Sequence, residues 1–495
     1  MRETIVAPRR GSGAIPVNTV LLAMWLLAGI TAGWGVLNFP PVKVLAVALG
    51  TVCVALAACK IEVALYVVGF FLVVLQEGET TPGTVFSFLE RLNRPSIPSL
   101  LEVLFAVLAA AFVVRHFTVP SKRYGFQDMK LPLALFFGLL FVALANGTVG
   151  GTDFIARKED FKRFIFPVLM FFCAVNILDS REKIARLLGI MFWVMLAKTY
   201  LANFYFLRGQ GFPYPYGDSM VVFMESGDQT LLVSILVAGI ALLAERKLSF
   251  KSCLFMLWGL APVLFALIFS YRRNAMWGAV FSLCLLWFLS QWDKKVRLLK
   301  IFLTAGLSAL LIFPAVPVTG SASSADFLIN RLASVVDKDQ SSNVAHMNEW
   351  RVTLEDTMRR PLFGLGLGSI HSPVPDFEVI NQQTVHNALL MLWMKMGGFA
   401  LLLFLWCLYR YCRLGVTEAL RRRDPLLTGL FATVGLWMIA MNVGPSWFYY
   451  RESCLMALIM AVVNRLAMLG RQPHTVPPEE CREGARYDTA QRKVR

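Results

Sequence analysis

The chain has 495 residues, of which 57% are hydrophobic and only 16% are charged, and its mean hydropathy is +0.60. Soluble proteins carry about a quarter charged residues, so this composition excludes a soluble enzyme, a disordered protein and a small disulfide scaffold, and it predicts a polytopic membrane protein. Lysine and arginine exceed aspartate and glutamate by 16 charges, which cytoplasmic loops or an anionic ligand would explain.

The chain begins with a polar segment, residues 1–16, that carries three arginines and precedes an apolar run at 17–37. The apolar core of a secretory signal peptide is shorter, at about 7–15 residues. We therefore interpret the run as a first membrane helix that is not cleaved, and residues 1–16 as a cytoplasmic N-terminal tail.

Apolar runs follow one another along most of the chain. A helix needs about 20 apolar residues to cross a hydrocarbon core of about 30 Å. Because several of the fourteen runs are short, they predict an all-α fold with 12–14 transmembrane helices, in an N-terminal bundle over 17–318 and a C-terminal group over 387–468. The runs are 17–37, 42–58, 61–75, 99–114, 131–146, 164–178, 187–206, 231–244, 253–270, 274–291, 299–318, 387–409, 425–443 and 450–468.

Lysine and arginine are unevenly distributed between alternate loops. If the N-terminus is cytoplasmic, the loops on that side hold 19 basic residues, whereas the alternate short loops hold 10. Basic residues favour the cytoplasmic side of a membrane, so this orientation is predicted. It places both termini in the cytoplasm, including a polar tail at 469–495 that we expect to be disordered, and it places the long loop at 319–386 outside.

The loop at 319–386 is the only long hydrophilic stretch between membrane runs. Its sequence predicts two short helices, at 326–336 and 343–358, the second from large apolar side chains that recur every four residues. The segment Gly364–Gly368 alternates glycine with leucine, which predicts turns. Its amides offer the alternative of a phosphate cradle, but no strand precedes them as in a nucleotide-binding motif.

Arg272 and Arg273 lie outside, between two membrane runs, against the orientation rule. Their connection is too short to reach far into water, and a charge near the bilayer is costly unless it is paired. Arginine binds phosphate through two parallel hydrogen bonds, so this pair is a candidate phosphate-binding site. The alternative is that both side chains extend to lipid headgroups.

Three further basic residues on the outside are candidates. Lys162 and Arg163 lie beside a membrane run, and an ion pair with Glu159, one helical turn earlier, is their alternative role. Arg351 belongs to the predicted loop helix at 343–358, where an ion pair with Glu355 is the alternative.

His386 and Asn387 lie where the long loop returns to the membrane. A neutral histidine accepts a proton from a hydroxyl group, which makes His386 a candidate general base, and Asn387 suits a helix N-cap. The same loop contains His346 and His371, for which structural roles are favoured. No histidine, cysteine or acidic residues have the spacing of metal ligands, so neither a metal nor another cofactor is predicted.

Three motifs occur in a fixed order within residues 270–403. The first is the turn Ser270–Arg273, the second is Trp350–Arg351 followed after about ten residues by Pro361–Gly366, and the third is His386–Asn387 followed by a glycine pair in an apolar helix. In order and spacing they resemble the C-terminal region of the O-antigen ligase and polymerase superfamily of bacterial envelope enzymes. A basic segment at 162–167 is similar to an earlier motif of that family.

The resemblance implies a C-type glycosyltransferase-like fold in the bacterial inner membrane, with the long loop in the periplasm. It implies an inverting, metal-independent transfer of a glycan from undecaprenyl pyrophosphate to an acceptor hydroxyl. In a ligase, which we favour, the acceptor is lipid A–core; in an O-antigen or exopolysaccharide polymerase it is another lipid-linked repeat unit. The expected partners are the lipid-linked donor, a lipid or glycan acceptor and the bilayer, and no nucleic acid.

Residue by residue, the resemblance implies that His386 is the base and that Arg273 and Arg351 are catalytic. Substrate-binding roles are implied for Lys162, Arg163, Arg272 and Asn387. The chain departs from the family pattern at Arg272, where the family has a serine, and at His346, where some members have an arginine.

A transporter of lipid-linked sugars is an alternative from a different class. It predicts charged residues buried within membrane helices and inverted repeats with broken helices. The sequence indicates neither, because the candidate charges cluster on one predicted face, and a transferase is therefore favoured.

Overall fold

The computed structural model of the chain describes residues 60–75, 100–118, 130–208, 212–213, 220–222, 226–245, 249–270, 272–312, 341–374, 385–443 and 449–471. The predicted membrane runs at 17–37 and 42–58 and the predicted short helix at 326–336 lie outside these residues, as do the N-terminal tail and most of the C-terminal tail.

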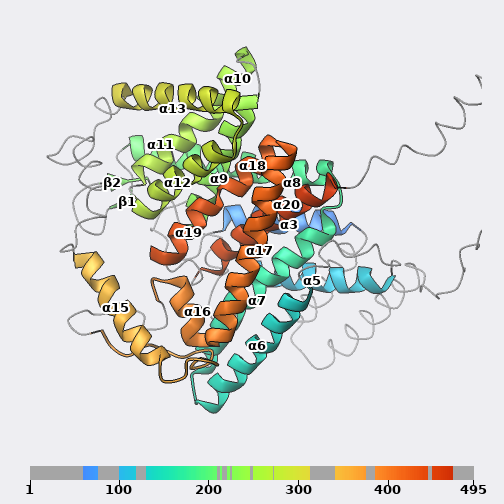
Figure 1. The fold of residues 1–495 in the computed structure, drawn as a ribbon, viewed down its shortest axis with the longest axis vertical. Coiled ribbons are helices and arrows are strands. Elements are labelled where there is room, and N and C mark those ends of the chain that lie inside the picture. The colour runs from blue at the N-terminus through green and yellow to red at the C-terminus, as the bar shows by residue number, and fades with distance from the viewer. Residues whose placement is uncertain are drawn as a thin grey trace, which may run out of the picture.

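Helices make up nearly all of the described chain (Figure 1). The strands β1 (Phe212–Pro213) and β2 (Met220–Val221) have two residues each and pair antiparallel. The helices are α3 (Ile61–Val74), α5 (Leu100–Thr118), α6 (Lys130–Val149), α7 (Phe154–Ile177), α8 (Arg181–Leu207), α9 (Ser226–Glu245), α10 (Phe250–Phe255), the π-helix η2 (Met256–Leu260), α11 (Ala261–Phe269), α12 (Arg273–Leu289), α13 (Trp292–Ile312), α15 (Ser341–Thr357), α16 (Ala388–Met396), α17 (Gly398–Arg422), α18 (Pro425–Ala432), α19 (Val434–Val443) and α20 (Tyr450–Leu469).

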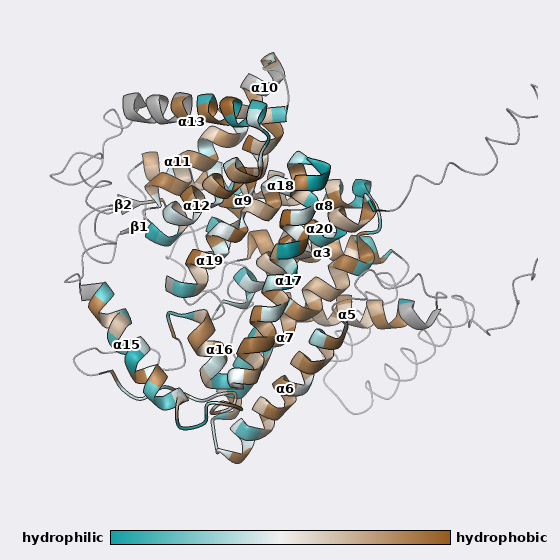
Figure 2. Cartoon of the chain, viewed as in Figure 1, coloured by the Kyte–Doolittle hydropathy of each residue, from teal (hydrophilic) through white to brown (hydrophobic). Residues whose placement is uncertain are grey.

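Five of the described helical segments are long and apolar enough to cross a membrane, and four shorter apolar helices accompany them. Figure 2 shows hydrophobic residues along these helices and hydrophilic residues at many helix ends and connections. The predicted class, an all-α polytopic membrane protein, is therefore confirmed. The total of 12–14 spans refers to the whole chain and stays a prediction.

The local sequence explains where several helices begin. Side-chain oxygens of Asp153, Ser180, Asn387 and Asp424 accept hydrogen bonds from first-turn N–H groups of α7, α8, α16 and α18. Such caps satisfy amides that have no partner within the helix. In α18 the cap is followed by Pro425, at a position where a helix tolerates proline.

The helix α20 lies at the centre of the bundle, and nearly all its residues between Arg451 and Ala467 are buried. It packs against α7 and α9, while α18 also packs on α9 and α12 packs on α19. A second, smaller core joins α6, α7, α16 and α17 with Leu367 from the segment after α15. This smaller core supports the candidate site described below.

The predicted membrane run at 387–409 is divided at Gly397 into α16 and α17. Gly397 has a φ of +86°, which L side chains rarely adopt, and a Cβ there would collide with the carbonyl oxygen of Leu362. The second half, α17, continues to Arg422, through most of the interval between the predicted runs at 387–409 and 425–443. Hydropathy gives no sign of the division because both halves are apolar.

The predicted membrane run at 299–318 begins later than the helix that the structure shows there. It belongs to α13, which begins at Trp292 with a charged first half. There Arg297 donates to the carbonyl of Ala244 at 3.3 Å, and Lys294 pairs with Glu245. These contacts fix the beginning of α13 against the end of α9.

Candidate functional site

The helix α15 carries the centre of the candidate site. Its residues Asn343, His346 and Glu349 recur every three positions and therefore lie along one side of the helix. The helix lies beside α16 at one end of the bundle (Figure 1). The carboxylate of Glu349, a residue only 4% exposed, is approached by three histidine rings.

His386 approaches Glu349 from the residues just before α16. Its backbone N–H donates to Oε2 of Glu349 at 3.1 Å, and its ring Nδ1 lies 3.1 Å from both carboxylate oxygens. Because an ionised carboxylate only accepts hydrogen bonds, this contact assigns the proton to Nδ1. In the neutral ring Nε2 then carries a lone pair and accepts protons, and the side chain is 36% exposed.

His346 and His371 contact the same carboxylate. Nδ1 of His346 lies 3.8 Å from Oε2 of Glu349, and the centres of the His346 and His386 rings are 4.4 Å apart. Nε2 of His371 lies 4.0 Å from Oε1 of Glu349, and the His371 side chain is fully buried. The loop thus gathers all three of its histidines around one acidic group.

The environment of Glu349 keeps it ionised. Burial raises the pKa of its carboxyl group, but the neighbouring imidazoles of His346 and His386 outweigh burial and lower the pKa from 4.5 to about 2. Glu349 is therefore negatively charged at neutral pH, so it holds the Nδ1 proton of His386 and stabilises the imidazolium that forms when Nε2 accepts a second proton.

The sequence spacing indicated no metal ligands, and the structure brings three residues with ligand atoms close together. The donor atoms of His346, Glu349 and His386 all lie within 4.8 Å of one another, and such a group is able to hold a metal ion. Short ligand spacings mark metal sites in a sequence, whereas 37 residues separate Glu349 from His386. The constellation depends on how the loop folds.

Arg273, the first residue of α12, reaches the same side of α15. Its Nη1 lies 3.5 Å from Oδ1 of Asn343, and Asn343 precedes Glu349 by about 9 Å along the helix axis. The amides at the start of α12 add to the attraction of the guanidinium for an anion. Arg272 immediately precedes α12 and is exposed. The structure therefore brings Arg273 and His386 to one helix.

The comparison with known families covers this part of the chain. The family described as O-antigen ligase matches residues 255–405. Residues 255–405 are therefore similar to this family, and we call them the O-antigen ligase domain. This domain contains Arg273, the helix α15 and His386, and the family implies an enzyme of the ligase or polymerase type. No curated protein matches the chain.

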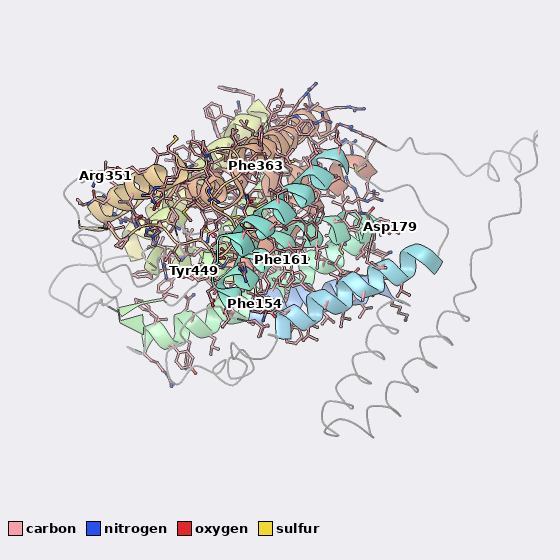
Figure 3. The ribbon with its side chains drawn as sticks, turned by 90° about the horizontal axis from the view of Figure 1, so that it is seen from below. Phe154, Phe161, Asp179, Arg351, Phe363 and Tyr449 are labelled. Atoms are coloured by element: carbon pink, nitrogen blue, oxygen red, sulfur yellow. The ribbon has the colours of Figure 1, made fainter. Side chains whose placement is uncertain are left out.

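Within the O-antigen ligase domain, Arg351 does not share the side of α15 that faces His386. It follows Glu349 by two positions, which is about 200° around a helix, and it is exposed. Figure 3 shows it on α15 at the edge of the structure. No ion pair joins Arg351 to Glu355, although both residues are described.

The glycine-rich segment of the domain forms a backbone joint between α6 and α16. The N–H groups of residues 365–367 donate to carbonyl groups of these two helices, and the N–H of Gly368 donates to Oδ2 of Asp160 at 2.7 Å. Gly366 has a φ of +99°, and a Cβ there would collide with the backbone of Gly147. The predicted turns are confirmed, and the alternative of a phosphate cradle is wrong because these amides already have partners.

A buried ion-pair cluster anchors this joint. Nζ of Lys395, a fully buried residue near the end of α16, donates to Oδ2 of Asp160 at 2.5 Å and to the carbonyl of Ser369 at 2.9 Å. Nη1 of Arg163 donates to Oδ1 of the same aspartate at 2.8 Å. Through Asp160, Arg163 is tied to the end of α16 opposite His386.

Lys162, the neighbouring candidate, is also held by acidic groups. Its Nζ lies 2.5 Å from Glu102 on α5 and 2.5 Å from Glu159 on α7. The pair with Glu159 is the alternative that the sequence offered. These contacts join α5 to α7 beside the smaller core.

We expect Lys395→Met to lower the free energy of unfolding by about 1.5–3 kcal/mol, because Asp160 loses one buried cation partner and keeps the other, Arg163. Thermal unfolding of the purified chain in detergent measures the loss. The matched control is Arg186→Met, which breaks the exposed pair with Glu182 on α8 and should cost less than about 1 kcal/mol. Equal losses in the two variants would show that Lys395 anchors nothing.

Sequence reasoning missed Glu349, Asp160 and Lys395. Lys395 gave a signal, because a lysine inside an apolar run is expected to have a buried partner. Glu349 follows His346 by three positions, and helical periodicity therefore predicts that the two residues share one face of the helix. Its contact with His386 is long-range, and no local pattern indicates it.

The structure also buries charges in membrane helices, contrary to the sequence-based expectation. Lys198 on α8 and Arg451 on α20 contact Asp228 on α9 at 2.9 and 2.5 Å. Both cations also donate to the carbonyl of Val73 at the end of α3. These contacts tie four helices together, and they remove one of the two arguments against a transporter.

Proposed function

We propose that the chain is a membrane glycosyltransferase of the O-antigen ligase type, which transfers a glycan from undecaprenyl pyrophosphate to a hydroxyl of lipid A–core. The observation that supports this most is the pairing of His386 with Glu349 inside the O-antigen ligase domain, because it leaves Nε2 of a half-buried histidine ready to accept a proton. The reaction takes place at the periplasmic face of the inner membrane, and both termini are cytoplasmic.

In this proposal Nε2 of His386 accepts the proton of the acceptor hydroxyl while the hydroxyl oxygen attacks the anomeric carbon of the donor glycan. The bond from that carbon to the phosphate oxygen breaks, and its electron pair leaves with undecaprenyl pyrophosphate. Attack opposite the leaving group inverts the anomeric centre. The donor is already activated, so the step needs neither a metal nor another cofactor.

Arg273 is the group that we propose for the leaving pyrophosphate. Fixed positive charge beside a developing anion is one of the strongest contributions to catalysis, and a guanidinium matches phosphate geometry. Arg272, exposed at the start of the same helix, supplies a second phosphate contact in this proposal. Arg351, on the outer side of α15, would contact a more distant part of the donor.

The remaining predicted substrate-binding residues have protein partners that favour a supporting role. Oδ1 of Asn387 caps α16, and its Nδ2 faces the carbonyl of Asn442 at 3.5 Å. Lys162 and Arg163 would have to break short ion pairs before binding a phosphate. We therefore propose that these three residues position the site.

The acceptor is tested by the product that accumulates when the gene is deleted. We expect long glycan to remain on undecaprenyl pyrophosphate, with none on lipid A–core, and restoration by the wild-type gene. Electrophoresis of surface glycan and analysis of lipid extracts measure both pools. Single repeat units attached to lipid A–core would instead favour the alternative, an O-antigen or exopolysaccharide polymerase.

A transporter remains a second candidate, because Lys198, Asp228 and Arg451 form a buried charged cluster within the membrane helices. The two functions are distinguished by mixing the purified chain in detergent with donor and acceptor. A transferase forms a covalent product there, whereas a transporter has no compartments to connect and forms none.

A further inference from the structure

We propose that His346, Glu349, His371 and His386 form a binding site for a divalent transition metal ion of the zinc class. We further infer that the bound ion inhibits transfer; this second part depends on the function proposed above, whereas the site itself does not.

The donor atoms are spaced for a small tetrahedral ion. Zinc bonds nitrogen and oxygen at about 2.0–2.2 Å, so its ligand atoms lie roughly 3.3–3.5 Å from one another. Around Glu349 the corresponding distances are 3.1 Å to His386, 3.8 Å to His346 and 4.0 Å to His371. The donor atoms of His346, Glu349 and His386 already lie within 4.8 Å of one another, and His371 would join them by moving closer to Glu349.

His371 gives an independent indication of a cation site. Its Nδ1 lies 2.7 Å from the carbonyl oxygen of Ser372, and a carbonyl only accepts, so the proton is on Nδ1 and Nε2 has a lone pair. Among the residues that the structure describes, this buried Nε2 has no hydrogen-bond partner, and it faces the carboxylate of Glu349. A lone pair and a carboxylate repel each other unless a positive charge lies between them.

The surroundings of His371 resemble the outer shell of a metal site. A ligating histidine usually donates its second ring N–H to a carbonyl or carboxylate, which fixes the ring. Here Ser372 provides that carbonyl, and Asp356 holds Ser372 in turn by accepting from its N–H at 2.6 Å and from its hydroxyl at 2.9 Å. The ring of His371 is thus oriented before any ion binds.

The donor set indicates the class of ion. Three imidazoles and one carboxylate suit zinc and neighbouring transition metals, whereas magnesium and calcium prefer oxygen ligands. The inner pair, Glu349 and His371, is buried, and the side chains of His346 and His386 are 31% and 36% exposed. An ion is therefore able to enter from the outer pair and bind against the inner pair.

Binding of the ion has a chemical consequence for His386. A metal at Nδ1 displaces the proton from that nitrogen, and the neutral ring then carries its proton on Nε2. Nε2 no longer has a lone pair for the acceptor hydroxyl. The ion would therefore compete with the acceptor proton for the same imidazole and lower the rate of transfer.

The site is tested by titrating the chelator-treated, full-length chain in detergent with Zn²⁺ alone. We expect about one zinc per chain, measured by elemental analysis after desalting, and a tetrahedral cobalt absorption spectrum when Co²⁺ replaces Zn²⁺. The decisive variant is His371→Asn, because its amide keeps a donor toward Ser372 but lacks an atom at the Nε2 position. It should weaken zinc binding by about 10–100-fold.

His346→Ala should weaken zinc binding to a similar extent, and Cys284→Ala on α12, outside the cluster, should leave it unchanged. If the wild-type chain binds no more zinc than His371→Asn, the proposal of a metal site is wrong. Hydrogen bonds to Glu349 would then be what holds the histidines together. A monodisperse profile of each variant on gel filtration shows that its fold is retained.

The effect of zinc on glycan transfer is measured in a separate experiment. We expect Zn²⁺ to inhibit transfer by the wild-type chain and to inhibit His371→Asn only at about 10–100-fold higher concentration. Zinc that binds without changing the rate, or that raises it, would overturn the inhibitory role and leave the site. A chain that binds zinc but never transfers glycan would overturn the proposed function alone.

Discussion

His386→Ala is expected to lower the rate of glycan transfer by about 10²–10⁴-fold, the range that general-base assistance usually contributes. The loss should appear in kcat, because the imidazole is needed when the hydroxyl attacks and not for binding the donor. Single-turnover transfer by the purified chain, with lipid-linked donor and acceptor, measures it. An unchanged rate at equal protein level would show that His386 is not the base.

Glu349→Gln tests the positioning of that base. A glutamine is able to present an amide N–H to Nδ1 of His386, and the ring proton then moves to Nε2, the wrong tautomer for accepting a proton. We therefore expect a loss approaching that of His386→Ala, with Glu349→Asp keeping more of the rate. Full activity in Glu349→Gln would mean that the tautomer of His386 is set by another group.

Arg273→Ala is expected to lower the rate by about 10²–10³-fold, the usual effect of removing one fixed donor from a developing anion. Its guanidinium begins α12 and reaches Asn343 on the helix that carries Glu349. Arg273→Lys keeps the charge but not the paired hydrogen bonds, so it should recover only part of the rate. Chain-length and yield of the transferred glycan, compared at equal protein level, measure both variants.

Two arginines serve as comparisons for Arg273. Arg208 is another basic residue on the predicted outside and lies over the ring of Phe204, so Arg208→Ala should leave transfer nearly unchanged. Arg351→Ala should lose less than Arg273→Ala, because Arg351 lies on the other side of α15. If Arg351→Ala loses as much, the donor extends around that helix and Arg351 has the catalytic role that its motif predicts.

The positions of several membrane helices could be predicted closely from the sequence. The run at 61–75 corresponds to α3, and the run at 450–468 corresponds to α20. Hydropathy succeeds here because each helix must hide its own backbone from lipid, and that requirement is met within one continuous segment. The loop helix predicted at 343–358 corresponds to α15, although Leu354 and Met358, two of the apolar residues behind that prediction, are exposed.

The centre of the site could be predicted only in part. The order of motifs around Arg273 and His386 indicated the O-antigen ligase resemblance, which the family match confirms. The contacts of Glu349 and Asp160 could not be predicted, because each joins segments far apart in the chain and a single sequence carries no record of such pairs. The division at Gly397 was missed because it depends on a neighbouring backbone rather than on hydropathy.

The joint around Gly397 has a consequence for how mutational data on this protein should be interpreted. Residues 361–368 contact the backbone of α16 and of the start of α17 directly. The N–H of Gly398 donates to the carbonyl of Pro361 at 2.7 Å, and the N–H of Leu365 donates to the carbonyl of Met394 at 2.7 Å. Any side chain added at Gly364 or Gly397 separates these surfaces. In a screen for lost activity, such substitutions would score like active-site residues, although their effect reaches His386 only through the placement of α16.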